Sequence, residues 1–361
     1  MSLAYFLLLA LLPLAAYSMA LTRKGRAWHT RHVPADAFSL ATCIAVAGWV
    51  DLSFGILAAL SVGWWVWKGW ERRPGATLWL SVAGAVWMGR AAPPELIHAA
   101  LSLVLAVGVI ESLVMLGQWL DVPIPIMKAP KDHLAGRVVG NIGHRTGAAV
   151  YIAVLVPLAF LTDYWWLLVP VYGLGLVLAP AFDAALAMTA GLLIVAPSSW
   201  WVVFLIGMGL WTLRVLMCRT AGEPMWQTFG RFSPRHMDTW KTRRIIWRTT
   251  ARRLRRWPAW LVGYGAGSFQ MHARTWRRST RLKEVFNEAH NDWLELSYEY
   301  GLIGMAAIGF WIWRMPWATG DPITGSAGAL GVAMLGNFPI RVAPIAAVGL
   351  LLAIVMMRRV A

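Results

Sequence analysis

Charged residues are scarce in this sequence, and their scarcity excludes an ordinary soluble fold. Asp, Glu, Lys and Arg make up only 14% of the 361 residues, whereas soluble domains carry about a quarter. Hydrophobic residues make up 58%, and the mean hydropathy is +0.57. Apolar runs of membrane-spanning length recur along the chain. The composition therefore predicts an all-α polytopic membrane protein.

Acidic residues and cysteines are scarcer still. Against 17 Asp and Glu stand 33 Lys and Arg, and the net charge of +16 predicts an anionic partner such as membrane lipids or a phosphate-bearing lipid. Nucleic acid is not expected, because the basic residues lie in loops between apolar segments. Cys43 and Cys218 define neither a disulfide framework nor a metal site. Since Cys/His clusters, HExxH and Asp-rich motifs are also lacking, we expect no metal and no cofactor.

We expect twelve apolar segments to form membrane helices, with both chain ends on the same side. The first is expected to be retained rather than cleaved, because no basic residue precedes it. Asp51 interrupts a run that is too long for one span, so two short helices with a tight turn are expected there. The segments are 2–20, two within 37–67, 75–89, 95–117, 146–161, 164–179, 181–196, 198–217, 291–313, 322–336 and 341–357.

These spans divide the chain into N-terminal helices (1–117), a central loop with helices (118–217), a large basic loop (218–289) and C-terminal helices (290–361). The loops at about 118–145 and 218–289 emerge on one face and can build one site together. That face carries 27 of the 33 Lys and Arg residues, against four on the opposite face. The positive-inside rule assigns such a face to the cytoplasm. The alternative is that the charges serve an anionic substrate on the far side.

The large loop contains two motifs. Residues 243–257 have the pattern of an arginine-rich amphipathic helix. Such a helix either lies on anionic headgroups or turns one or two arginines inward to hold a phosphate. The sequence GYGAGSF at 263–269 lacks the preceding strand that a dinucleotide-binding loop needs. We expect a tight turn there, with Phe269 as an anchor.

A polar cluster stands at the entrance of the following apolar run, in AHNDWLELSYEYGLIG at 289–304. At about 100° per residue, His290, Ser297, Gly301 and Gly304 share one stripe of a helix. Small residues on that stripe would let a second helix approach closely, with His290 at the mouth of a helix bundle. The alternative is that His290 and Asn291 only cap the helix.

Three ionisable residues lie inside predicted spans: His98, Glu111 and Asp183. Such residues are costly in lipid and are candidates for a polar pathway. Their spacing shows no pairing among them, so we expect them to be buried by packing and satisfied.

Three blocks, in this order, resemble the O-antigen ligase and polymerase superfamily of bacterial inner-membrane glycosyltransferases. They are GRVVGNIGHRTGAAVYIAVLVPL at 136–158, Arg243-x-x-x-Trp247 followed by GYGAGSF, and the block at 289–304. The ligase signature is His, then Asn, Ser or Gln, nine residues, Gly, two residues, and Gly, Thr or Tyr. The residues that meet it are His290, Asn291, Gly301 and Gly304, and Glu299 also matches. The resemblance covers about residues 130–345.

The chain departs from the family pattern at two places. His144-Arg145-Thr146 follows the first block where the family often has further Asn residues. Asp183 stands where many members have the arginine of a Ser-Arg-Gly/Ala motif. One familiar substrate arginine is therefore missing, and Arg145 or Arg137 would stand in for it.

The resemblance implies a GT-C-like fold of about 12 transmembrane helices with one large, partly helical periplasmic loop. It implies transfer of a glycan from undecaprenyl diphosphate to an acceptor hydroxyl at the periplasmic face of the inner membrane, without metal. Of the catalytic residues, Arg243 would bind the diphosphate and His290 would be the base, or the orienting hydrogen-bond partner, for the hydroxyl. The substrate-binding residues would be Arg137, Arg145, Asn291, Arg244 and Arg248.

The acceptor separates three activities that share these motifs. A lipid A–core sugar would make the protein a ligase, which we favour because the ligase signature is fully met. A second lipid-linked repeat would make it a polymerase, and a pilin Ser or Thr an oligosaccharyltransferase. A transporter or flippase for an anionic lipid would explain the basic loops equally well. Many transporters show an internal repeat, and this chain has no convincing one.

Overall fold

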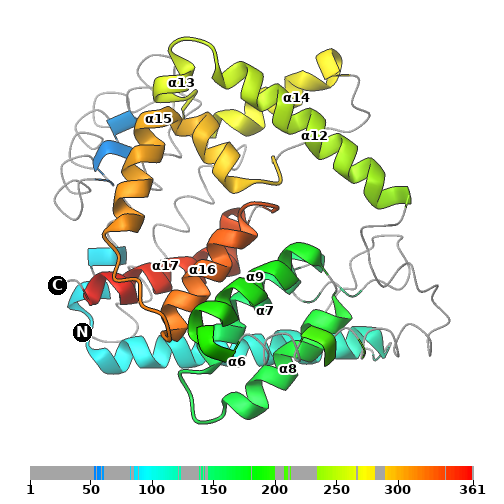
Figure 1. The fold of residues 1–361 in the computed structure, drawn as a ribbon, viewed down its shortest axis with the longest axis vertical. Helices are drawn as coiled ribbons and strands as arrows, with labels where there is room; N and C mark the ends of the chain where they lie inside the picture. The colour runs from blue at the N-terminus through cyan, green and yellow to red at the C-terminus, as the bar shows by residue number, and fades with distance from the viewer. Residues whose placement is uncertain are drawn as a thin grey trace, which may run out of the picture.

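The described part of the chain is built from helices. The computed structural model describes residues 89–120, 145–179, 181–199, 234–265, 267–280, 289–337 and 339–359, with isolated positions within 53–60, 82–87, 122–142 and 207–212. Every regular element in these ranges is a helix (Figure 1). The predicted all-α class is therefore confirmed for this part of the protein.

Seven apolar helices coincide with predicted spans. They are α6 (Pro94–Trp119), α7 (Arg145–Ala159), α8 (Trp165–Leu178), α9 (Phe182–Val195), α15 (Asp292–Trp313), α16 (Pro322–Ala333) and α17 (Ala343–Arg358). Within the described ranges only α6 is long and apolar enough to cross a membrane, whereas α7, α8, α9 and α17 are shorter apolar helices. The predicted spans at 2–20, 37–67, 75–89 and 198–217 lie wholly or largely outside the described residues.

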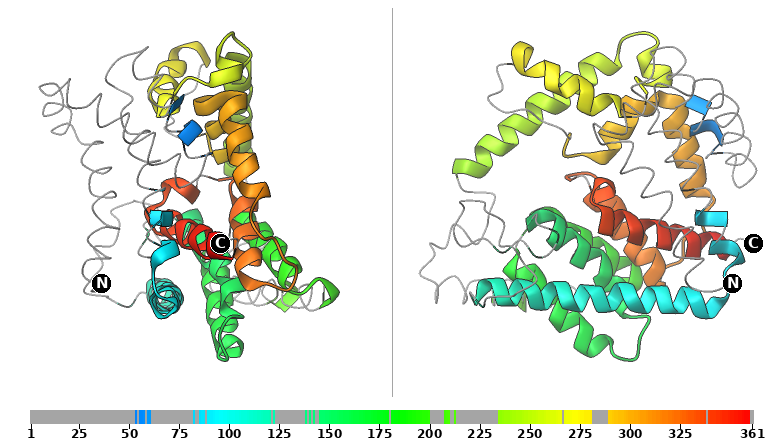
Figure 2. Two further views of the ribbon diagram at one scale, coloured as in Figure 1. Left: turned by 90° about the vertical axis from the view of Figure 1, so that its left-hand side faces the viewer. Right: turned by 180° about the vertical axis from the view of Figure 1, so that it is seen from behind.

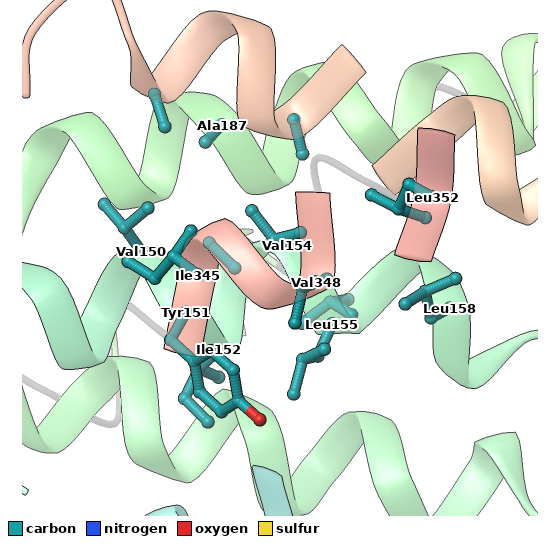
Figure 3. Packing of buried hydrophobic residues seen from close by; sticks show 14 of the residues in the cluster. Val150, Tyr151, Ile152, Val154, Leu155, Leu158, Ala187, Ile345, Val348 and Leu352 are labelled. Carbon is teal, nitrogen blue, oxygen red and sulfur yellow. The ribbon is translucent and has the colours of Figure 1, made fainter. Parts of the chain in front are cut away.

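α7 forms the centre of the helical core. Its side chains between positions 147 and 159 are all buried, because α6, α8, α9 and α16 pack around it. Figure 3 shows α7 side chains meeting Ala187 of α9 and Val348 of α17. Ser326 of α16 donates a hydrogen bond to the Val154 carbonyl at 2.8 Å. Close packing and such interhelical hydrogen bonds are what hold helices together where lipid removes the hydrophobic driving force.

Small residues bring α9 and α16 into backbone contact. A Cβ atom added to Gly325 would lie 2.8 Å from the Gly191 carbonyl oxygen, closer than real side chains approach. Pro157 of α7 fills the space beside both glycines. The three helices therefore form one tightly packed unit, of the kind that small residues permit inside membranes.

Contacts at one end of these helices join segments far apart in sequence. Arg358, at the end of α17, donates from Nη1 to the Ala92 carbonyl, at the start of α6. The Gly320 amide, just before α16, donates to the Ile194 carbonyl near the end of α9 at 2.8 Å. We call this group of helix termini the Arg358 end.

An ion pair also lies at the Arg358 end. Asp321 caps α16 by accepting from the Thr324 amide at 3.0 Å, and Arg359 donates to both of its carboxylate oxygens at 2.6 and 3.1 Å. Burial raises the pKa of Asp321, but the hydrogen bonds from Arg359 and Thr324 and the charge of Arg359 outweigh it. The net pKa therefore lies below the ordinary value of 3.8.

A second group of helices folds from the large basic loop. It comprises α12 (Pro234–Leu254), α13 (Ala259–Val262) and α14 (Ser268–Thr280). Figures 1 and 2 show these helices on one side of the molecule, away from α6 and α8. The predicted amphipathic helix is α12, which begins at Pro234 rather than 243 and ends at Leu254 rather than 257. The earlier end fits Pro258, which disfavours a helical conformation in the residue before it.

Candidate functional site

The predicted His-Asn pair lies at the start of α15. Asn291 is the N-cap of the helix, because its Oδ1 accepts from the Leu294 amide at 2.9 Å. His290 comes before the helix and has a left-handed φ of 52°. The predicted stripe is therefore wrong at His290, since a residue outside the helix cannot share its face. The capping interpretation holds for Asn291.

Three backbone hydrogen bonds fix the segment that carries His290. The Trp247 indole of α12 donates to the Ala289 carbonyl at 2.8 Å, and the Ala289 amide donates to Glu295 Oε2 at 3.1 Å. The Asp292 amide donates to the Met334 carbonyl at 2.9 Å. His290 is thus held between α12, the first turn of α15 and the chain that follows α16.

Within the chain between α16 and α17 (334–342), residue 340 meets the same segment through the Asp292 side chain. The Asp292 carboxylate is buried, and its Oδ2 accepts from the Ile340 amide at 3.0 Å. We call residues 334–340 the interhelical turn. A buried carboxylate at a helix N-terminus is favourable, because it accepts backbone N–H groups and faces the positive end of the helix dipole.

Arg243 binds to the interhelical turn from the side of α12. Its Nη1 donates to the Gly336 carbonyl at 2.9 Å and lies 3.6 Å from Oδ2 of Asp183, at the start of α9. Both side chains are largely buried, with 15% and 13% of their surface exposed. Asp183 is therefore satisfied, as the sequence predicted, and its partner is the arginine singled out for catalysis.

The Arg-x-x-x-Trp motif spans one helical turn, so both side chains project from the same face of α12. Arg243 contacts the interhelical turn, and Trp247 contacts the residue before His290. The structure therefore brings Arg243 and the His290 segment to one place, although 47 residues separate them in sequence.

The glycine-rich motif of the loop binds to a kink in α15. Gly301 leaves the helical conformation, with φ 61° and ψ −164°, and α15 bends there (Figure 1). The Tyr264 amide donates to the Tyr298 carbonyl at 2.9 Å, and the Gly265 amide donates to the Glu299 carbonyl at 2.8 Å. The expectation that Gly301 continues a helical stripe is therefore wrong, because the loop takes the hydrogen bonds that a regular helix would make.

The close approach expected at Gly301 comes from backbone of the loop rather than from a second membrane helix. A Cβ atom on Gly301 would lie 2.4 Å from the Gly263 amide nitrogen, and one on Gly263 would lie 2.2 Å from the Glu299 carbonyl oxygen. Both glycines have positive φ, which side chains disfavour. We call residues 263–265 the glycine strap.

Aromatic rings pack the loop helices onto α15. Tyr298 stacks on Tyr264 with ring centroids 4.5 Å apart, and its hydroxyl is 2.7 Å from His272 Nδ1. Phe269 and Trp276 of α14 meet the same tyrosine edge-on, and Phe269 is fully buried. The predicted turn and the anchoring role of Phe269 are confirmed.

The first sequence block is also tied to a helix of the core. The Gly140 amide donates to Gln118 Oε1 at 2.9 Å, and the Ile142 amide donates to Oε1 of the buried Glu111 at 3.3 Å. Glu111 is buried and has a hydrogen-bond partner, as predicted. His98 is exposed on α6, so the expectation of burial is wrong there.

The remaining predicted site residues do not all join Arg243 and His290. Arg244 and Arg248 are exposed on α12. Arg145 begins α7, and its side chain is not among the described ones; Arg137 lies outside the described residues. Sequence reasoning placed Asp292 in the polar cluster but gave it no role, because its contact with Ile340 lies 48 residues away and leaves no local pattern.

Among the described residues, no group of three His, Cys, Asp or Glu side chains could hold a metal ion. No protein-family model, curated protein or solved structure was found to match this chain. The chemistry of the site therefore carries the functional argument.

Proposed function

We propose that the protein is a membrane glycosyltransferase of the O-antigen ligase type, which moves a glycan from undecaprenyl diphosphate to an acceptor hydroxyl. The observation that carries the proposal is the meeting of Arg243 and the His290 segment at the interhelical turn. These residues come from two of the three blocks that resemble the family. A fixed cation near a segment that carries an imidazole would suit transfer from a diphosphate donor.

The proposed topology has about 12 transmembrane helices in a GT-C-like arrangement in the bacterial inner membrane. The pairing of helix termini supports it. The Arg358 end collects the starts of α6 and α16 and the ends of α9 and α17. The interhelical turn collects the starts of α9, α15 and α17 and the end of α16. Each of these two groups thus contains both helix starts and helix ends, as expected when successive helices run in opposite directions across a membrane.

The proposed site faces the periplasm, where lipid-linked glycans are presented. This orientation sets aside the positive-inside rule, which discounts long loops. Between positions 239 and 283 the loop contains basic residues and no Asp or Glu. In this proposal the excess charge serves a diphosphate donor and the anionic membrane surface.

Transfer requires one bond to form and one to break. The acceptor oxygen attacks the anomeric carbon, the bond from that carbon to the diphosphate oxygen breaks, and the lipid diphosphate leaves with the electron pair. His290 accepts or orients the hydroxyl proton, since imidazoles exchange protons near neutral pH. Arg243 faces the negative charge that grows on the diphosphate, and a fixed cation there lowers the barrier.

The additional binding residues are proposed from the resemblance. Asn291 is adjacent to His290 and is the nearest candidate to contact the acceptor. Arg145 lies at the start of α7, and it or Arg137 is the proposed second diphosphate ligand. The acceptor itself is proposed to be lipid A–core, with a lipid-linked repeat and a pilin hydroxyl as the alternatives.

The first test is mass spectrometry of lipopolysaccharide, lipid-linked glycan and pilin from cells that lack the protein. Rescue is compared for wild type, His290→Ala, Arg243→Ala and Arg314→Ala. We expect loss of one glycoconjugate, which names the acceptor, and rescue by wild type and Arg314→Ala only. Arg314 is a matched control because it lies at the other end of α15, over Phe310. Full rescue by His290→Ala, at equal protein level in the membrane, would refute the catalytic role.

A second test separates an enzyme from a flippase. Purified protein is mixed with lipid-linked glycan and acceptor in detergent, where no two compartments exist for transport. Formation of a glycosidic bond supports the transferase. If the glycan stays on its lipid with every acceptor, while liposomes containing the protein move the donor between leaflets, the transporter is the correct assignment.

A further inference from the structure

The two faces of α12 differ in what they contact. Ile246 and Thr250 are buried, and Arg243 and Trp247 bind the candidate site. The opposite face carries basic side chains three or four residues apart, all of them exposed. On α12 they are Lys241, Arg244, Arg248 and Arg252, and Arg255 directly follows the helix; we call these five residues the basic stripe.

Acidic residues are few near the basic stripe in the sequence, and Asp238 precedes Lys241 by three positions. No Asp or Glu occurs between positions 239 and 283. The inward-facing Arg253 lies instead over the Trp276 ring, 5.1 Å from its centroid. The stripe is therefore a strongly positive surface, and its complement is an anion.

The length of the basic stripe excludes a single small anion as its partner. Residues 241 and 255 are 14 positions apart, which is about 21 Å along a helix. A phosphate or diphosphate group touches only a fraction of that distance. A row of charges of this length fits a surface that carries many anions, such as a leaflet of anionic phospholipid.

Two exposed tryptophans extend the basic stripe. Trp257 and Trp260 are 71% and 42% exposed, and their rings lie 5.9 Å apart. Ile245, beside Arg244, is also exposed. Indole rings favour the boundary between headgroups and acyl chains, and a basic face with adjacent tryptophans is typical of helices that lie on membranes.

We propose that the basic stripe, with Trp257 and Trp260, docks on an anionic phospholipid surface. The negative potential of such a surface attracts each Lys or Arg that lies near it, and salt screens this attraction. This binding holds the outer face of α12 to the headgroups while its inner face holds Arg243 at the interhelical turn. It assigns Arg244 and Arg248 to lipid, and it does not depend on the glycosyltransferase activity.

The test uses the full chain in nanodiscs of phosphatidylcholine, with and without phosphatidylglycerol. In a Cys43→Ser, Cys218→Ser background, Ile245→Cys carries an environment-sensitive fluorophore, and the uncharged quencher acrylamide reports its exposure. Phosphatidylglycerol is expected to lower the quenching constant about two-fold, and about 1 M salt to restore it, because the Debye length falls to about 3 Å.

The decisive variant is Arg244→Ser/Arg248→Ser/Arg252→Ser, which is expected to abolish the phosphatidylglycerol effect. The control Arg274→Ser/Arg277→Ser/Arg278→Ser removes the same number of charges from α14. This control is expected to retain the phosphatidylglycerol effect. In phosphatidylcholine alone, each variant must have the same quenching constant as its parent. A variant that does not is replaced by Arg248→Ser alone, which is expected to lose part of the phosphatidylglycerol effect. Equal quenching in both lipids for the parent, or equal loss in stripe and control variants, would overturn the proposal.

Discussion

At the scale of single residues, the site shows how one substitution changes the role of a position. Asp183 stands where many members of the resembled family carry an arginine. Here the carboxylate lies 3.6 Å from Arg243, the loop arginine of the Arg-x-x-x-Trp motif. The acid at this position therefore helps to hold Arg243. A largely buried arginine needs such a partner, because an unpaired buried charge is costly.

Asn291 has two assigned roles, helix cap and substrate contact, which one pair of variants separates. Asn291→Ala removes the hydrogen bond to the Leu294 amide and should lower the unfolding free energy by about 1 kcal/mol. Asn291→Ser keeps a capping oxygen and should retain wild-type thermal stability in detergent. If Asn291→Ser is stable but transfers glycan poorly, the residue also binds substrate. Wild-type transfer by this variant would limit Asn291 to capping.

At the scale of elements, the glycine strap and the kink of α15 form one structure. Gly301→Ala should destabilise the protein by roughly 1–3 kcal/mol, because the alanine has a positive φ and its Cβ meets the Gly263 backbone. Gly309 is the matched control, since it is in the same helix with no atom near its missing Cβ. Gly309→Ala should be neutral or slightly stabilising. Thermal unfolding and proteolysis of the loop measure the difference, and equal behaviour of the two variants would contradict the account.

The bounds of the apolar helices were predictable, whereas their irregularities were not. α16 begins at Pro322, directly after its N-cap Asp321, and this start signal can be read from the sequence. The kink at Gly301 depends on hydrogen bonds that the amides of residues 264 and 265 donate to carbonyl groups of α15. The periodicity of the α15 sequence therefore does not reveal the kink. In the same way, spacing identified Arg243 and Trp247 as neighbours on α12. It could not show that Gly336 and Ala289 would be their partners.

At the scale of the whole molecule, the termini of the described helices are joined by a titratable contact. The pKa of Asp321 is lowered mainly by its hydrogen bond from Arg359, so the stabilisation is complete above the ordinary pKa of 3.8 and is lost as pH falls through the lower folded value. Arg359→Gln leaves the capping carboxylate in place. We expect the difference in Tm between wild type and this variant to be constant at neutral pH and to shrink below about pH 4. A difference that persists at the lowest pH would show that the pair does not act through its charge.

The glycine strap also has a consequence for exchanging parts between related chains. Residues 263–265 and the kinked half of α15 make each other's hydrogen bonds, so neither is self-sufficient. A large loop transplanted alone would arrive without the bend that receives it. The unit of exchange is instead the stretch from the start of α12 to Gly304, which carries both partners and Arg243, Trp247 and His290 with them. A chimera with a junction inside that stretch separates the glycine strap from the α15 residues that it binds. A chimera with both junctions outside the stretch keeps these two partners together.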